Sequence, residues 1–253
     1  MSFIDFLFFG GYGRTIDLCL ERSRTGKQTK IFTPNAEMLA SATKSAALMR
    51  LLRSADLPLP DGVGVYLGAR LLGLSPQERT NGIDLAERLL TAAEQNEMSV
   101  FLLGAKRGVA QRAARRLELR FPKLKIAGFH HGYFEKQGKE NDAVIEKIRR
   151  SGAEILFVCL GFPEQEGWIS KNMPRLSSVK IAAALGGSID VWAGKTVRAP
   201  ESVRKMGLEW LWRAVSSPRR VARLPEVFSF AALCTSLKLS EVANRGVNLL
   251  RNR

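Results

Sequence analysis

Short apolar runs alternate with amphipathic segments along the chain from residue 30 to residue 190. In the clearest run, residues 155–160, six apolar residues follow one another, and polar residues begin soon after them. A strand that is apolar on both faces is usually buried on both faces, as in a parallel sheet covered by helices. Similar runs predict further strands at 30–32, 57–59, 99–103, 125–128 and 179–185.

Helical periodicity fills the intervals between these strands. It predicts helices at 15–24, 38–52, 62–73, 85–96, 110–120, 141–150 and 168–176. Thr33 can cap the helix at 38–52, with Pro34 at its first position. Residues 3–9 fit either a strand or a short amphipathic helix. Strands that alternate with helices predict an α/β fold with a parallel sheet and helices on both faces.

Polar residues follow the ends of the predicted strands. They are Thr33 and Asn35 after 30–32, Asp61 after 57–59, Tyr133 after 125–128, Gln165 after 155–160 and Asp190 after 179–185. Ligands of open α/β sheets bind beyond the carboxyl ends of the strands, so we expect these side chains to meet at one sheet edge. The alternative is purely structural: Asp61 and Gly62 suit a turn, and acidic residues beside Gln165 suit a helix N-terminus.

One glycine-bounded turn and one arginine are candidates for binding phosphate. Gly104 closes the strand at 99–103 and precedes a helix, a geometry that suits a phosphate at the helix N-terminus, and Gly161 ends the run at 155–160. Arg79 can clamp a phosphate through two parallel hydrogen bonds, or it is a solvated loop residue. The glycines match no dinucleotide fingerprint, which argues against a NAD-dependent enzyme.

The charge of the chain is concentrated near its C-terminus. Its 253 residues suffice for one large α/β domain, or for a domain with an appendage, and carry a net charge of +15. Residues 195–253 contribute +8, from twelve Lys and Arg and four Glu. Trp and Arg in this apolar tail favour an anionic membrane surface over nucleic acid, although a packing helix with a solvated basic face is the alternative.

The cysteines and the N-terminal residues indicate the cellular compartment. The three cysteines lie far apart, so we expect no disulfide framework and a reducing compartment. Residues 3–9 make a poor signal peptide, and no apolar run is long enough to span a bilayer. His130 and His131 lack further ligands at a useful spacing, so we expect no zinc site. These features predict a cytoplasmic protein that can touch a membrane.

Eight segments, in order, carry a family resemblance over roughly residues 30–225. They are Thr-Pro-Asn-Ala-Glu at 33–37, Asp-Gly at 61–62, Asn-Gly-Ile-Asp-Leu at 81–85, Phe-Leu-Leu-Gly at 101–104, His-Gly-Tyr-Phe at 131–134, Leu-Gly-Phe-Pro-Glu-Gln-Glu at 160–166, Gly-Gly-Ser-Ile-Asp at 186–190, and Arg-Ala-Pro-Glu with Gly-Leu-Glu-Trp-Leu-Trp-Arg at 198–213. Together they resemble the WecG/TagA/CpsF family of bacterial glycosyltransferases (glycosyltransferase family 26). One departure is Glu164, where the family often has Lys.

The resemblance implies a Rossmann-like catalytic domain at 1–194 and a basic, membrane-associating helical appendage at 195–253. The expected reaction is inverting transfer of N-acetylmannosamine, N-acetylmannosaminuronic acid or glucuronic acid from a UDP donor. The acceptor would be a polyprenyl-diphosphate-linked saccharide in surface polysaccharide synthesis, at the inner face of the cytoplasmic membrane. No cofactor or metal is expected, since the Asp-x-Asp metal motif is absent. A basic nucleic-acid-binding α/β protein is the alternative, and a homo-oligomer stays open.

The resemblance also implies residue roles. Asp61 would be the base that removes the acceptor proton, with Thr33 and Asn35 positioning it or the acceptor. Gln165 would hydrogen-bond the donor, and Tyr133 and Asp190 would hold the uridine, with Gly104 and Gly161 in the same UDP-sugar site. Charge on the departing UDP would be compensated by a set of cations: Arg79, Arg213, Arg219, Arg220 and Arg223.

Overall fold

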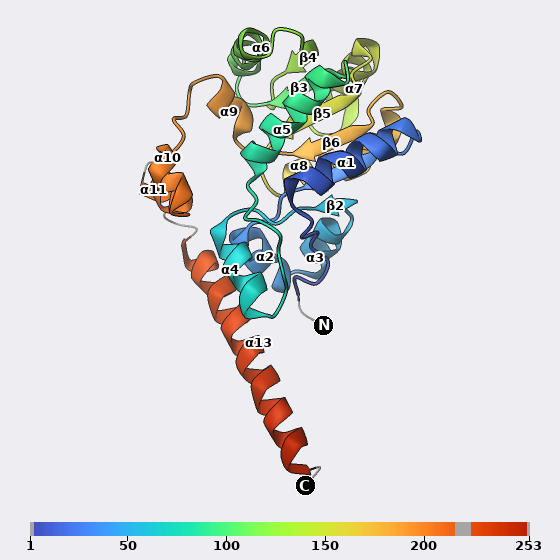
Figure 1. The fold of residues 1–253 in the computed structure, drawn as a ribbon. Coiled ribbons are helices and arrows are strands. Elements are labelled where there is room, and N and C mark those ends of the chain that lie inside the picture. The colour runs from blue at the N-terminus through green and yellow to red at the C-terminus, as the bar shows by residue number, and fades with distance from the viewer. Residues whose placement is uncertain (1–2, 216–223, 252–253) are drawn as a thin grey trace.

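A computed structural model describes residues 3–215 and 224–251 (Figure 1). At its centre lies a six-stranded sheet with the strand order β2-β1-β6-β5-β3-β4, in which all paired strands are parallel. The strands are β1 (Thr29–Phe32), β2 (Leu57–Pro58), β3 (Ser99–Gly104), β4 (Lys125–His130), β5 (Ile155–Cys159) and β6 (Ile181–Ala184). The α/β class expected from the apolar pattern is confirmed.

A helix follows each strand in the chain, and further helices follow the last strand, β6. They are α1 (Gly11–Arg24), α2 (Ala36–Thr43), α3 (Ala46–Arg53), α4 (Val63–Leu71), α5 (Gly82–Gln95), α6 (Val109–Arg120), α7 (Gly138–Ser151), α8 (Glu164–Asn172), η1 (Met173–Arg175), α9 (Ser188–Trp192), α10 (Glu201–Lys205), α11 (Glu209–Val215) and α13 (Leu224–Arg251).

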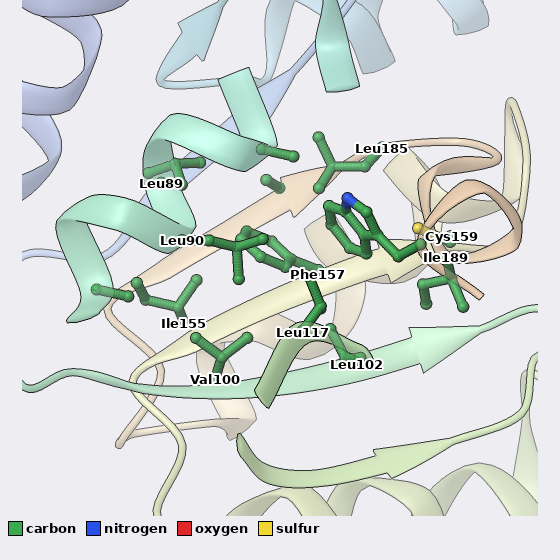
Figure 2. Packing of buried hydrophobic residues seen from close by; sticks show 14 of the residues in the cluster. Leu89, Leu90, Val100, Leu102, Leu117, Ile155, Phe157, Cys159, Leu185 and Ile189 are labelled. Atoms are coloured by element: carbon green, nitrogen blue, oxygen red, sulfur yellow. The ribbon is translucent and has the colours of Figure 1, made fainter. Parts of the chain in front are cut away.

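The two faces of the sheet bury separate apolar clusters, because neighbouring strand residues point to opposite sides. On one face, Phe157 packs with Val100 and Leu102 beneath α1, α5, α6 and α9 (Figure 2). On the other face, Leu156 and Val158 pack against α7 and α8. Strand β5 is therefore covered on both sides, which explains why the run at 155–160 is apolar without interruption.

A third apolar cluster joins the C-terminal helix to the main body. Helix α13 packs on α2 and α4, and its Phe230, only 2% exposed, and Cys234 are buried there. A Cβ atom at Gly68 of α4 would lie 2.7 Å from the Phe230 ring, so the close approach of the two helices needs glycine. Beyond this contact α13 projects away from the sheet (Figure 1). The division at residue 194 stays a prediction.

Several local predictions need correction. The helix predicted at 38–52 is two helices, because Ser45 accepts a hydrogen bond from the Leu48 N–H and starts α3. Helix α2 is capped by Asn35, not Thr33, since the Asn35 side chain accepts from the Met38 N–H at 3.0 Å. Residues 3–7 form turns and a bend, and residues 8–9 are irregular, so the segment is neither a strand nor a helix.

Helix starts also differ from the periodic pattern. Helix α8 begins at Glu164 rather than 168, and α5 begins at Gly82 rather than 85. The first turn of α8 is polar, and the first turn of α5 contains Gly82 and Asp84, so apolar periodicity alone does not detect these helix starts. As a result the polar residues of two family-like segments lie on helix N-termini rather than in loops.

Candidate active site

A cleft of about 1250 Å³ opens at the carboxyl edge of the sheet, between the strand ends and the segment that contains α10 and α11. It is lined by all six polar residues that follow predicted strand ends and were expected to share one edge: Thr33, Asn35, Asp61, Tyr133, Gln165 and Asp190. Arg79 and Gly161, further candidates from the sequence, line it too. The structure therefore brings these distant residues together, while their individual roles stay predictions.

Asp61 is held between the end of β2 and the start of α5. Its Oδ1 atom accepts a hydrogen bond from the Gly82 N–H at 3.0 Å, and its own N–H donates to the Pro34 carbonyl at 2.9 Å. The N–H groups of a helix start have no intrahelical acceptor and favour a nearby negative charge. The first turn of α5 thus supplies a fixed partner for the carboxylate.

Thr33 and Asn35 are placed by hydrogen bonds to the protein. The Thr33 hydroxyl is buried and donates to the Ala184 carbonyl at 3.1 Å, which links β1 to the end of β6. A Cβ atom at Gly82 would approach the Thr33 hydroxyl to 3.2 Å, so the three elements that carry Thr33, Asp61 and Gly82 are tightly packed. Asn35 caps α2 beside them.

Gln165 joins two loops of the cleft. Its Oε1 atom accepts from the Gly161 N–H at 3.3 Å and the Gly186 N–H at 3.0 Å, and its Nε2 donates to Glu166 at 2.9 Å. The side chain is buried, and three of its hydrogen bonds are to the protein itself. Gln165 therefore holds the loops after β5 and β6 in place, and its predicted contact with a donor sugar would be additional.

Arg79 lines the cleft beside the end of α10, and its role as a phosphate clamp stays a prediction. Its guanidinium donates to the Arg204 carbonyl at 2.6 Å and to the Lys205 carbonyl at 3.5 Å. The last carbonyls of a helix have no intrahelical donor, which explains why the end of α10 attracts this cation. The backbone of Arg213 lies in α11 but its side chain is outside the described part, and the remaining three predicted cations, Arg219, Arg220 and Arg223, lie outside the described residues.

Tyr133 and Asp190 line the cleft from the segments that follow β4 and β6. Tyr133 is 66% exposed, on a loop that Lys136 fixes by donating to the carbonyls of Gly132 and Phe134 and by pairing with Glu164 at 3.2 Å. An exposed ring on a fixed loop is suited to stacking. Asp190, in the first turn of α9, pairs with Lys195 at 3.1 Å.

Gly104 packs against a neighbouring strand, and the predicted substrate contact at this position stays untested. A Cβ atom there would lie 2.3 Å from the Cys159 carbonyl oxygen, so only glycine allows β3 and β5 to approach at this point. The next residue, Ala105, is the one that lines the cleft. Gly161 does line it, in a left-handed conformation with φ of 88° that favours glycine.

Sequence reasoning missed a buried acid beside the cleft loops. Glu166 is fully buried, its Oε1 accepts from Gln165, and its Oε2 has no hydrogen-bond partner among the described residues. Burial raises the pKa of Glu166 from an ordinary 4.5 to about 7. The sequence showed this residue only as one of several polar residues at a helix start.

Replacing Glu166 by glutamine should remove a pH dependence of stability. Between pH 4.5 and about 7 the folded protein binds more protons at Glu166 than the unfolded chain does, so this group makes stability fall as the pH rises. The full shift corresponds to about 3 kcal/mol. Urea unfolding should show Glu166→Gln close to the wild type at pH 4.5 and more stable by up to about 3 kcal/mol at pH 8.

Glu118→Gln is the matched control, because Glu118 is exposed on α6. This control variant should change the free energy of unfolding by the same small amount at both pH values. A difference between Glu166→Gln and wild type that does not vary with pH would contradict a raised pKa of Glu166.

The described residues hold no group of three or more His, Cys, Asp or Glu side chains that could bind a metal ion. Nor is any helix in the described ranges both long and apolar enough to cross a bilayer. A parallel α/β sheet with a large cleft at its carboxyl edge, and a carboxylate fixed there, is typical of an enzyme that binds a polar substrate.

The family follows from comparison with known proteins. A profile of the glycosyl transferase WecG/TagA/CpsF family matches residues 11–243, so the chain belongs to this family and is a glycosyltransferase. The resemblance in the eight sequence segments is thereby confirmed.

Curated relatives give more detail about similar proteins. One from Bacillus spizizenii is 37% identical over 194 residues, covering 77% of this chain and 74% of the relative. Others, from Staphylococcus aureus strain MRSA252 and Bacillus subtilis strain 168, are 35% and 33% identical and cover 78% and 79% of this chain and 76% and 77% of the relatives. All three are named N-acetylglucosaminyldiphosphoundecaprenol N-acetyl-beta-D-mannosaminyltransferase.

Proposed function

We propose that the protein transfers N-acetylmannosamine, or a closely related sugar, from a UDP donor to a saccharide on a polyprenyl diphosphate, with inversion at the anomeric carbon. The observation that carries this proposal is the convergence of Thr33, Asp61, Gln165 and Asp190 on one cleft. The names of the relatives support the sugar and the lipid-linked acceptor. The product would enter the synthesis of a cell-surface polysaccharide.

Inversion by direct displacement assigns a role to Asp61. The acceptor hydroxyl oxygen forms a bond to the anomeric carbon while the bond from that carbon to the UDP oxygen breaks, and the hydroxyl proton passes to Asp61. Such a base must lie within hydrogen-bond reach of the acceptor hydroxyl. Thr33 and Asn35, on the adjacent loop, would orient the acceptor or the carboxylate.

The departing UDP would be held without a metal, because the sequence lacks the Asp-x-Asp motif that commonly binds one. Cations then have to offset the charge that develops on the diphosphate. Arg204 lines the cleft, and four predicted arginines follow it in the chain: Arg213, Arg219, Arg220 and Arg223. The exposed Tyr133 ring would stack on the uracil, and Asp190 would accept hydrogen bonds from the uridine.

Membrane association would bring the enzyme to its lipid-linked acceptor. Exposed apolar side chains follow one stripe of α13: Phe228, Ala232, Leu239 and Val242. The buried residues Phe230 and Cys234 lie on the opposite side of the same helix. Residues 195–253 as a whole carry a net charge of +8. Apolar side chains on such a basic segment suit an anionic membrane interface, so we propose that the protein associates peripherally with the inner face of the cytoplasmic membrane.

Ligand stabilisation and transfer assays test the donor. UDP at about 100 times its Kd should stabilise the fold by about 2.7 kcal/mol and so raise Tm by several degrees, whereas NAD should not. A panel of UDP-sugars with a polyprenyl-diphosphate saccharide should give transfer from UDP-N-acetylmannosamine, unaffected by EDTA. Stabilisation by single-stranded DNA alone, without transfer from any UDP-sugar, would instead support a nucleic-acid-binding protein.

A further inference from the structure

Two of the family-like segments, 81–85 and 198–213, meet in one ionic network that the proposed chemistry does not use. Arg198 pairs with Asp84 of α5, with 2.6 Å between Nη2 and Oδ1, and with Glu209 of α11, with 3.5 Å between Nε and Oε1. The second oxygen of Glu209 accepts from the Asn81 side-chain amide at 3.0 Å. The network thus joins residues 81–84 to residues 198 and 209, which lie more than a hundred positions further along the chain.

The contact between Arg198 and Glu209 is largely shielded from water, whereas the Asp84 side chain is 36% exposed. The side chains of Arg198 and Glu209 are only 17% and 12% exposed. Although burial acts to lower it, the two carboxylates raise the pKa of Arg198 above its ordinary value. An ion pair removed from water contributes little net stability, but removing one partner leaves an uncompensated charge. The main effect of the network is therefore to hold α11 in one position rather than to raise the free energy of unfolding.

The network ends beside Asp61. Asn81 is the N-cap residue of α5, and Gly82, the next residue, donates its N–H to the Asp61 carboxylate. Glu209 therefore holds the residue that precedes this donor. A second contact, from Arg79 to the end of α10, fastens the same C-terminal segment to the loop before α5.

We propose that Arg198 and Glu209 are positioning residues, which hold α11 against the first turn of α5 and thereby set the Asp61 carboxylate for proton removal. The inference rests on the proposed role of Asp61 as the base. It predicts that the turnover step, more than donor binding, depends on the contact between Asn81 and Glu209.

An exchange of hydrogen-bond donor and acceptor tests the proposal. Asn81→Asp puts two carboxylates face to face, and Glu209→Gln removes one charge beside Arg198. Each single variant should lower kcat by a factor of about ten or more, the effect of one lost charge-assisted hydrogen bond, while KM for the UDP-sugar changes little. In the double variant the amide introduced at position 209 can donate to the carboxylate introduced at position 81, and this variant should recover most of kcat.

Hydrogen exchange gives a readout that does not need activity. Amides 209–215 should exchange faster in both single variants and at nearly the wild-type rate in the double variant. The matched control is Glu201→Gln, which removes an exposed carboxylate of α10 that pairs along its own helix with Lys205. It should leave kcat and exchange unchanged.

The outcomes separate the two proposals. If the single variants change neither kcat nor exchange, or if the double variant recovers exchange without kcat, the positioning role is wrong. If the wild type transfers no UDP-sugar, the proposed function fails, while the exchange measurements still decide whether the contact holds α11. If the single variants mainly raise KM for the UDP-sugar, and the double variant restores KM rather than kcat, the network supports donor binding. That result would contradict the proposal.

Discussion

Replacing Asp61 by asparagine is expected to lower kcat by a factor of about 100 to 10,000, the usual contribution of a general base. Asparagine has nearly the same shape and can still accept the Gly82 N–H through its carbonyl oxygen, so the cleft should keep its geometry. UDP should bind as in the wild type, because the base is needed only when the acceptor loses its proton. Single-turnover transfer and calorimetric UDP titration measure the two quantities separately.

Asp17→Asn serves as the control for this substitution, since Asp17 is exposed on α1 and does not line the cleft. Turnover by Asp61→Asn within about twofold of wild type would remove Asp61 from the base role. Loss of UDP binding together with turnover would show that the residue supports donor binding instead.

Two glutamates on the exposed stripe of α13 should abolish most membrane binding. Phe228 and Leu239 are each 65% exposed and lie on the side of the helix opposite Phe230. Withdrawing an apolar side chain from a bilayer costs about 1.5–3 kcal/mol, so Phe228→Glu with Leu239→Glu should weaken binding to vesicles of phosphatidylglycerol and phosphatidylethanolamine by a factor of about 100 or more. Vesicle flotation measures this change.

Ser236→Glu with Ser240→Glu adds the same charge to the same helix outside the stripe. This control should reduce binding far less, through electrostatic repulsion alone. If the two double variants bind equally, charge rather than apolar insertion governs the association. If the wild type does not float with the vesicles, the membrane proposal fails.

Local patterns predicted most strands because apolar burial acts on consecutive residues. The run at 155–160 indicated a strand covered on both faces, and β5 packs into a separate cluster on each side. Helix boundaries were harder to predict, because they depend on hydrogen bonds rather than on apolar spacing. The sequence predicted Thr33 as the cap of α2, but the Thr33 hydroxyl donates to the Ala184 carbonyl, and Asn35, a residue type that caps helices at least as well, accepts from the Met38 N–H.

The sequence by itself determined the parallel α/β class, the family, and the set of polar residues that would share one sheet edge, because strand ends and motif order are properties of the linear chain. The tertiary structure alone decided which of those residues are already bound to the protein. Gln165 and Arg79 hold cleft segments together, and Gly104 packs against Cys159. Such partners come from segments far apart in the chain, and their distances depend on how helices and strands pack, which no local pattern encodes.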